Sequence, residues 1–238
     1  MSVLARRHFW TRPAPPLLVI YDCDGVLIDS ETIADRLVAD EMTRLGWEIS
    51  AEECGRRFLG ITYGDMCPMI EAELGRALPD DWLARFLARV VETMAREAEP
   101  VPGARAALEA TTALGLEWRV ASNSSHAEMA AKFTRVAFLD LVTERMHSAQ
   151  DVLARGGKAK PAPDLFLAVA ASVGVDPVDC VVVEDSPTGI RAAVAAGMTC
   201  LAYSHHGDPE MATALGAAPF QDMHELPDLL RHALAGMP

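Results

Sequence analysis

The sequence predicts an α/β protein, a doubly wound parallel sheet with a helical cap domain inserted after its first strand. An apolar run at 17–21 ends in acidic residues and a glycine, the pattern of a buried strand that leads into a ligand site. Apolar residues recur at helical spacing through 31–99, where strong strand-like runs are lacking. From residue 100 onward short apolar runs alternate with helical patterns, which is typical of parallel sheets with helices on both faces.

Two acidic residues close the first predicted strand. The run 17–21 leads directly into Asp22 and Asp24, and Gly25 follows. Ligands of open α/β sheets bind beyond the carboxyl ends of the strands, so both carboxylates are expected at the functional site. Two acids this close repel each other unless a cation or a shared proton offsets them. Cys23 stands between them, and strand alternation turns its side chain away.

Composition indicates the predicted domain boundaries. Residues 1–16 form an N-terminal tail whose prolines hold its end extended, and they lack the apolar stretch of a secretory signal. The cap covers 31–99, and prolines and a glycine at 100–103 mark the return to the sheet. The core domain therefore comprises 17–30 and 100–238.

Four further strands are expected within the core. Short apolar runs place them at 117–121, 141–143, 180–183 and 199–203. Helical patterns lie between these runs, which predicts a doubly wound parallel sheet.

Charge and cysteine usage narrow the partners. The net charge is -13, from 34 acidic and 21 basic residues, which argues against nucleic acid or an anionic membrane as partner. No segment approaches the roughly twenty apolar residues of a membrane span. The five cysteines show no paired metal-ligand spacing, so they are interpreted as reduced thiols of a cytoplasmic protein. Nothing requires more than a monomer, and the oligomeric state is left open.

Four ordered motifs carry a family resemblance. They are DCDGVLIDSE at 22–31, VASNSS at 120–125, KPAPDLF at 160–166 and CVVVEDSPTGIRAAVAAGM at 180–198. Together they resemble the haloacid dehalogenase superfamily, in the subfamily with a helical cap that includes β-phosphoglucomutases and many sugar-phosphate phosphatases. The resemblance implies a Rossmann-like core and phosphoryl transfer through an aspartyl phosphate.

The resemblance also implies roles for the acidic residues. Asp22 is the expected nucleophile, because a carboxylate that attacks phosphorus divides hydrolysis into two easier steps. Asp24 is the expected general acid and base. The side chain of Asp22 and the backbone carbonyl of Asp24 are expected to bind Mg²⁺ together with Glu184 and Asp185, since hard oxygen ligands suit this ion. Asp185 is expected to be the firmer ligand, with Glu184 acting directly or through water.

The same resemblance places the phosphate site. Ser122, at the end of the second core strand, and Lys160, at the start of a helix, are expected to hold the phosphoryl group, and Asn123 to touch substrate. Lys158 is the rival of Lys160, but only Lys160 directly precedes the Pro-Ala-Pro-Asp stretch of the motif.

Substrate selection is assigned to the cap, which closes over the site. Thr62 and Tyr63 are the expected cap contacts. Cap arginines are further candidates, and one aimed inward would favour a second acidic group on the substrate. These arginines are Arg56, Arg57, Arg85 and Arg89. The expected substrate is a small phosphorylated metabolite, namely a sugar, sugar-acid or polyol phosphate.

Alternatives to magnesium-dependent hydrolysis fit the sequence less well. Phosphonate-cleaving relatives use a cap lysine, and 31–99 contains none. Dehalogenating relatives lack the second acid, which is Asp24 here. Mutases place a His near Ala34 and an Arg after the loop that precedes Tyr63, and this sequence lacks both. A β-phosphoglucomutase-type mutase remains the alternative, and a non-catalytic binding module is the alternative from another class.

Overall fold

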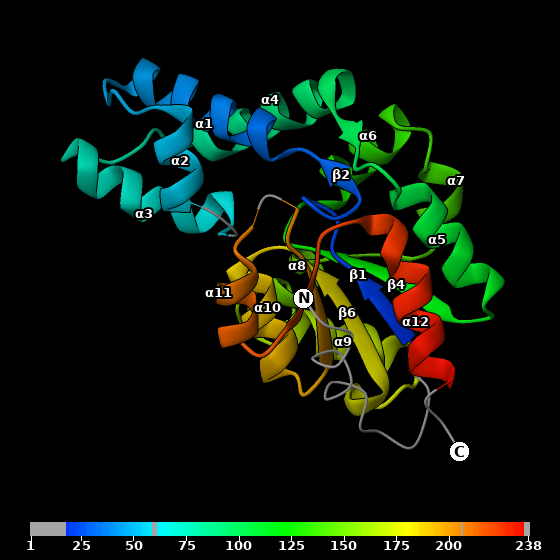
Figure 1. The fold of residues 1–238 in the computed structure, drawn as a ribbon. Helices are drawn as coiled ribbons and strands as arrows, with labels where there is room; N and C mark the ends of the chain where they lie inside the picture. Colours follow the sequence, from blue (N-terminus) through cyan, green and yellow to red (C-terminus); the bar gives the residue numbers. More distant parts are fainter. Residues whose placement is uncertain (1–17, 59–60, 206, 236–238) are drawn as a thin grey trace.

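The computed structural model describes residues 18–58, 61–205 and 207–235, and it is built on a six-stranded parallel sheet (Figure 1). The strand order is β5-β4-β1-β6-β7-β8, which places β1 near the centre. The strands are β1 (Leu18–Tyr21), β4 (Glu117–Ser122), β5 (Met146–Ser148), β6 (Cys180–Glu184), β7 (Thr199–Tyr203) and β8 (Ala218–Phe220). The predicted fold class is confirmed.

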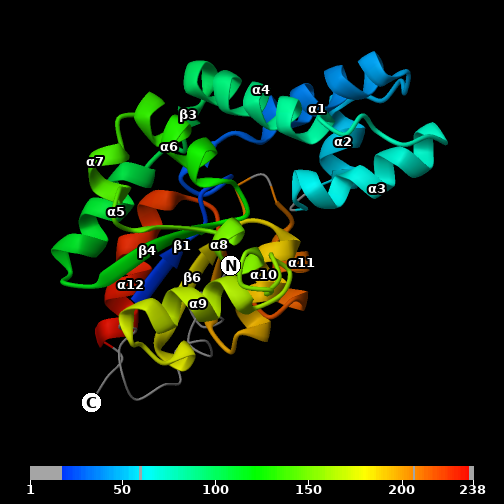
Figure 2. The same ribbon diagram turned by 180° about the vertical axis from the view of Figure 1, so that it is seen from behind.

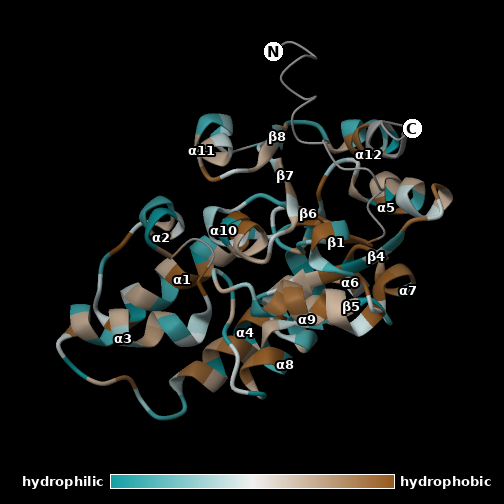
Figure 3. Ribbon diagram, turned by 90° about the horizontal axis from the view of Figure 1, so that it is seen from below, coloured by the Kyte–Doolittle hydropathy of each residue, from teal (hydrophilic) through white to brown (hydrophobic). Residues whose placement is uncertain are grey.

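Helices cover both faces of the sheet (Figures 1 and 2). One apolar cluster joins the sheet to α5 (Ala104–Ala113), α6 (His126–Arg135), α7 (Leu139–Val142) and α12 (Leu226–Ala235). The other joins it to α8 (Ala149–Leu153), α9 (Asp164–Val173), α10 (Pro187–Ala195) and α11 (Pro209–Ala214). Short 3₁₀ turns lie at Pro177–Asp179 and Met223–Glu225. In Figure 3 the central strand β1 and helix α9 are largely brown: β1 is buried between the two helical layers, and α9 packs an apolar face on the sheet.

A four-helix insert follows the first strand, as predicted. Its helices are α1 (Glu31–Leu45), α2 (Ala51–Phe58), α3 (Tyr63–Leu74) and α4 (Trp82–Glu97). They share an apolar core separate from the two sheet clusters, and Met42, Ile70 and Val90 are fully buried in it. Burial of such side chains stabilises the insert by roughly 1.5–3 kcal/mol each.

Two chain crossings join the insert to the sheet. Strand β2 (Ile28–Asp29) leaves the core and pairs antiparallel with β3 (Glu99–Pro100), which returns to it. The backbone of Val101 also donates to the carbonyl of Leu27. Because the crossings are paired, the insert is held above the carboxyl end of β1.

Two predicted positions were wrong. The expected strand at 141–143 is occupied by the end of α7, and the edge strand beside β4 is β5, which begins at Met146. The opposite edge strand, β8, has no counterpart among the predicted strands. Val142 packs its side chain into the core from a helical turn, and so short an apolar run does not distinguish the two structures. Lys160 does not begin a helix, because α9 starts at Asp164. Proline at 161 biases Lys160 away from helical backbone angles.

Two predictions concern the N-terminal residues and membrane spans. Those for the tail at 1–16 and for residue 17 lie outside the described residues. Within the part of the chain that the structure describes, no helix has the length and apolar character needed to cross a membrane.

Candidate active site

Asp22 lies directly after β1, where its carboxylate meets a buried lysine. Lys160 Nζ donates to Asp22 Oδ1 at 2.8 Å, to Glu184 Oε1 at 2.7 Å and to the carbonyl of Ala121 at 2.9 Å. An ammonium group has three protons, so all of them are used. The lysine therefore binds together residues from three neighbouring strand ends and offsets the charge of two carboxylates.

Glu184 is the most deeply buried acid of the site. Its side chain is fully buried, and its Oε2 accepts hydrogen bonds from the backbone N–H groups of Asp185 and Ser186 and from the Ser186 hydroxyl. Ser186 is also the N-cap of α10. Gly189 in the first turns of that helix is required, because a Cβ there would overlap the Glu184 carboxylate. The chain thus folds so that β6 presents Glu184 and then turns sharply.

Three carboxylates form a candidate metal centre. Asp22, Glu184 and Asp185 each offer an oxygen, and these atoms all lie within 4.8 Å of one another. Gly25 has φ of 70°, and a Cβ at that position would overlap the Asp185 carboxylate, so the glycine gives Asp185 its place. Carboxylate oxygens in this number fit Mg²⁺. Glu184 already accepts bonds at both oxygens, which favours Asp22 and Asp185 as the direct ligands.

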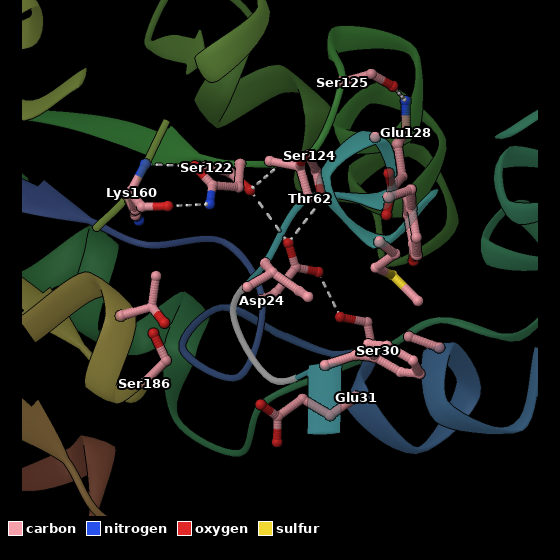
Figure 4. Close-up of a pocket in the computed structure, with 18 of the residues that line it drawn as sticks. Asp24, Ser30, Glu31, Thr62, Ser122, Ser124, Ser125, Glu128, Lys160 and Ser186 are labelled. Atoms are coloured by element: carbon pink, nitrogen blue, oxygen red, sulfur yellow. Dashed lines mark hydrogen bonds between the residues drawn. The ribbon is translucent and has the colours of Figure 1, made fainter. Parts of the chain in front are cut away.

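Asp24 is surrounded by donors (Figure 4). Its Oδ2 accepts hydrogen bonds from Ser122 Oγ at 3.1 Å and Ser124 Oγ at 2.9 Å. Its Oδ1 accepts from Ser30 Oγ, in the turn after β2, and from Lys132 Nζ at 2.5 Å. The lysine, together with the hydroxyl groups, lowers the pKa of Asp24 to about 2 although burial opposes this. Asp24 is therefore charged in this arrangement.

Lys132 is the charged partner of Asp24 that the sequence motifs do not identify, and Ser30, Ser124 and Glu128 beside it were not predicted either. Lys132 lies on α6, is 1 % exposed, and donates to Glu128 Oε1 at 2.5 Å and Ser124 Oγ at 3.1 Å as well as to Asp24. The signal available was the Glu128–Lys132 pair at i,i+4, preceding the buried aromatic residue Phe133. That pattern usually marks an exposed helix face, so only the tertiary packing reveals its burial.

The pKa of Asp22, the candidate nucleophile, is shifted in the opposite direction to that of Asp24. Burial is the main cause that raises the pKa of Asp22 to about 8, Lys160 opposes it, and the nearby charges of Glu184 and Asp24 raise it further. A divalent cation beside Asp22 would favour its charged form. The two aspartates therefore have very different environments although one residue separates them.

The predicted phosphate-site residues lie together at the ends of β4 and the following turns. Ser122 Oγ accepts from the backbone N–H of Ser124 while it donates to Asp24. Asn123 holds the backbone of Lys160, accepting from its N–H at 3.1 Å and donating to its carbonyl at 3.3 Å. The structure thus brings Ser122, Asn123 and Lys160 together, and their contacts with a phosphate stay predictions. Lys158 is exposed and its side chain plays no part in this cluster.

A cavity of about 350 Å³ lies between the strand ends and the insert. Its walls include Asp22, Asp24 and Lys160 from the core, and Thr62 and Tyr63 from the insert. Thr62 also caps α3 by accepting from the N–H of residue 65, and the Tyr63 ring packs edge-on against that of Phe86. The size suits a small metabolite.

The four candidate cap arginines point elsewhere. None of them is among the described residues that line the cavity. Arg89 donates to Glu41 at 2.6 Å, Arg57 to Glu73 at 2.8 Å, and the exposed Arg56 and Arg85 pair with acids of their own helices or caps. The possibility of an inward arginine is therefore not realised at these positions.

Comparisons with known proteins agree with this fold. Residues 17–197 match the family model for haloacid dehalogenase-like hydrolases. Hexitol phosphatase B of Escherichia coli (strain K12) is 33% identical over 78% of this chain and 82% of the relative, and 6-phosphogluconate phosphatase of the same organism is 26% identical over 89% and 93%. A solved structure of a putative β-phosphoglucomutase from Bacteroides vulgatus is 25% identical with a TM-score of 0.77, covering 96% of this chain and 93% of that chain.

Proposed function

This chain belongs to the haloacid dehalogenase-like hydrolases, and we propose that it hydrolyses a small sugar, sugar-acid or polyol phosphate through a phosphorylated Asp22. It is a phosphatase for small phosphorylated metabolites, as its relatives are. The observation that carries the finer proposal is the pair of aspartates at the end of β1, one beside Lys160 and the other beside Lys132.

In the first step an Asp22 oxygen attacks phosphorus. Lys160 already holds Oδ1, and among the described residues none donates to Oδ2, which leaves that oxygen for the new bond. The ester P–O bond breaks as the Asp22–phosphorus bond forms, and the leaving alkoxide takes a proton from the Asp24 carboxyl group. Asp24 is charged while Lys132 holds it, so it must turn toward the substrate and carry a proton at this stage.

In the second step water releases the phosphate. Asp24 accepts a proton from the attacking water, whose oxygen bonds to phosphorus while the bond to Asp22 breaks. Inorganic phosphate leaves and the Asp22 carboxylate is restored. Lys160, 5 % exposed, keeps that carboxylate oriented through both steps.

The carboxylates of Asp22 and Asp185 would hold Mg²⁺, with Glu184 beside them. When bound, the ion supplies positive charge that offsets the phosphate and the carboxylates during transfer. The tight turn at Gly25 and the bonds around Glu184 prearrange this acidic edge without the need for large movement.

Mutase chemistry is the second candidate, since a solved β-phosphoglucomutase-like structure shares the fold. Ala34 lines the cavity, so a methyl group faces the site near the position where the resembling mutases carry a His. No described cavity residue is an arginine. Both observations support release of phosphate over retention of a sugar bisphosphate.

The test is phosphate release from sugar, sugar-acid, polyol and nucleotide phosphates, with and without Mg²⁺. We expect turnover that requires Mg²⁺ and that Asp22→Asn abolishes. Asp40→Asn is the matched control, because it makes the same change at an exposed position of α1. Activity that survives Asp22→Asn would remove Asp22 as nucleophile. If no ester releases phosphate and hexose phosphates are interconverted only when a bisphosphate is added, the protein is a mutase instead.

A further inference from the structure

Both lysines that line the cavity have every proton committed to the protein. Lys160 donates to two carboxylates and a backbone carbonyl, and Lys132 donates to two carboxylates and a hydroxyl. An ammonium group has three donors and no more. Among the described residues of the cavity wall, these lysines are the only cationic side chains. Among the residues that the structure describes, the cavity wall therefore offers no cation with a free proton for a second negative group on a substrate.

The wall of the cavity is strongly acidic. Seven carboxyl groups and two lysines line it. Each lysine is shared by two carboxyl groups, and Glu31, Asp35 and Asp185 have no lysine partner at all. A divalent cation between Asp22 and Asp185 would offset only part of this excess. Mg²⁺ and the groups at the strand ends would therefore bind the phosphate. The rest of the cavity wall repels anions.

Asp35 is the acid of this wall that lies on the insert without a partner. It stands on α1 one turn after Glu31, and its carboxylate approaches Gly55 of α2 so closely that a Cβ there would overlap it. None of the described residues donates a hydrogen bond to it. Burial raises its pKa to about 6. The fold therefore keeps a half-buried carboxyl group at the cavity that forms no ion pair with a described residue. A polar group held this way at a cavity is a candidate for ligand contact.

We propose that the part of the substrate beyond the phosphate is an uncharged chain of hydroxyl groups, which donate hydrogen bonds to Asp35, and that a carboxylate there is rejected. This inference rests on the proposed function and names the substrate class within it. A polyol or neutral sugar phosphate satisfies Asp35 without a new charge. A sugar-acid phosphate would bring its carboxylate among acids without a lysine partner, and the described part of the cavity wall has no uncommitted cation to receive it.

The experiment uses six-carbon substrates that differ at one group. D-Sorbitol 6-phosphate and 6-phosphogluconate differ at C1, which is a hydroxymethyl group in one and a carboxylate in the other. We expect kcat/KM to favour the polyol by at least about tenfold, because two unit charges several ångströms apart near a protein surface repel by that order. Equal values, or a preference for the acid, would overturn the inference.

Substitution of Asp35 locates the effect. In Asp35→Asn the preference for the polyol should fall about threefold to tenfold, mainly because the acid improves. Asp40→Asn, the same change on the exposed side of α1, should leave the preference as it is. A preference that Asp35→Asn does not move would exclude Asp35 as the determinant.

A binding measurement separates this inference from the proposed function. Calorimetry on Asp22→Asn with Mg²⁺ gives Kd for the same two phosphates without turnover. Tenfold tighter binding of the polyol supports the substrate class even if neither compound is hydrolysed, in which case only the proposed chemistry fails. Hydrolysis of both compounds with tighter binding of the acid would leave the chemistry intact and overturn the substrate class.

Discussion

The buried pair of Glu128 and Lys132 makes a sharp prediction about stability. Lys132→Met removes the ammonium but leaves the Glu128 side chain, 3 % exposed, as an unpaired buried charge. Loss of one partner of a buried pair costs about 3–5 kcal/mol of unfolding free energy. The second partner, Asp24, is 29 % exposed on its side chain and keeps three hydroxyl donors, so it adds little to this loss.

A double variant tests whether the unpaired charge of Glu128 causes this loss of stability. Lys132→Met with Glu128→Leu removes both charges, and apolar replacement of a buried pair is often neutral or stabilising. We therefore expect the double variant to be more stable than Lys132→Met alone. Urea unfolding at pH 7 measures this as a recovered midpoint with an unchanged slope. Lys158→Met, the same substitution at an exposed lysine, should change stability by less than about 0.5 kcal/mol.

Activity separates the positioning role of Lys132 from its structural role. Both variants lose the donor that holds Asp24, so kcat should fall in both, by up to the 10²–10⁴-fold that general acid–base catalysis contributes, roughly. Stability should recover in the double variant while kcat does not. A coupling energy below about 0.5 kcal/mol between positions 128 and 132 would refute the buried-pair reasoning.

Three further outcomes are expected. Gly25→Ala should displace Asp185 and weaken Mg²⁺ activation, whereas Gly46→Ala, also at positive φ but with open space for a Cβ, should show only a loss of stability of about 1 kcal/mol in urea. Asp35 binds its proton more tightly in the folded than in the unfolded protein, so stability should fall as the pH rises from 3.8 through about 6. Asp35→Asn should therefore raise the unfolding free energy by up to about 1 kcal/mol at pH 7, after allowance for solvent screening, and leave it unchanged at pH 3.5. Mg²⁺ at a hundred times its Kd should stabilise the protein by about 2.7 kcal/mol in thermal unfolding, and Asp185→Asn should remove most of this gain.

Local pattern accounts for what could be predicted. The apolar run before Asp22 and the alternation of short apolar runs with helical patterns after residue 100 predict a parallel sheet. Buried strands and amphipathic helices each have a characteristic spacing of apolar residues, so both can be recognised from sequence. The acids at 184 and 185 were placed at a strand end for the same reason. The strand beside β4 was predicted too early in the chain because β5, Met146–Ser148, has no apolar run and owes its conformation to pairing with β4.

By itself the sequence determined the fold class, the helical insert and the convergence of acidic residues at the strand ends, since each depends on contacts between near neighbours or on the common edge of parallel strands. Only the tertiary structure decided which charges meet. Lys132 lies 108 residues from Asp24 in the sequence, and burial of that lysine follows from how α6 packs beside the site. The direction of the cap arginines and the lone carboxyl group of Asp35 are likewise set by helix packing, because rotation of a helix by a fraction of a turn changes which side chains face a cavity.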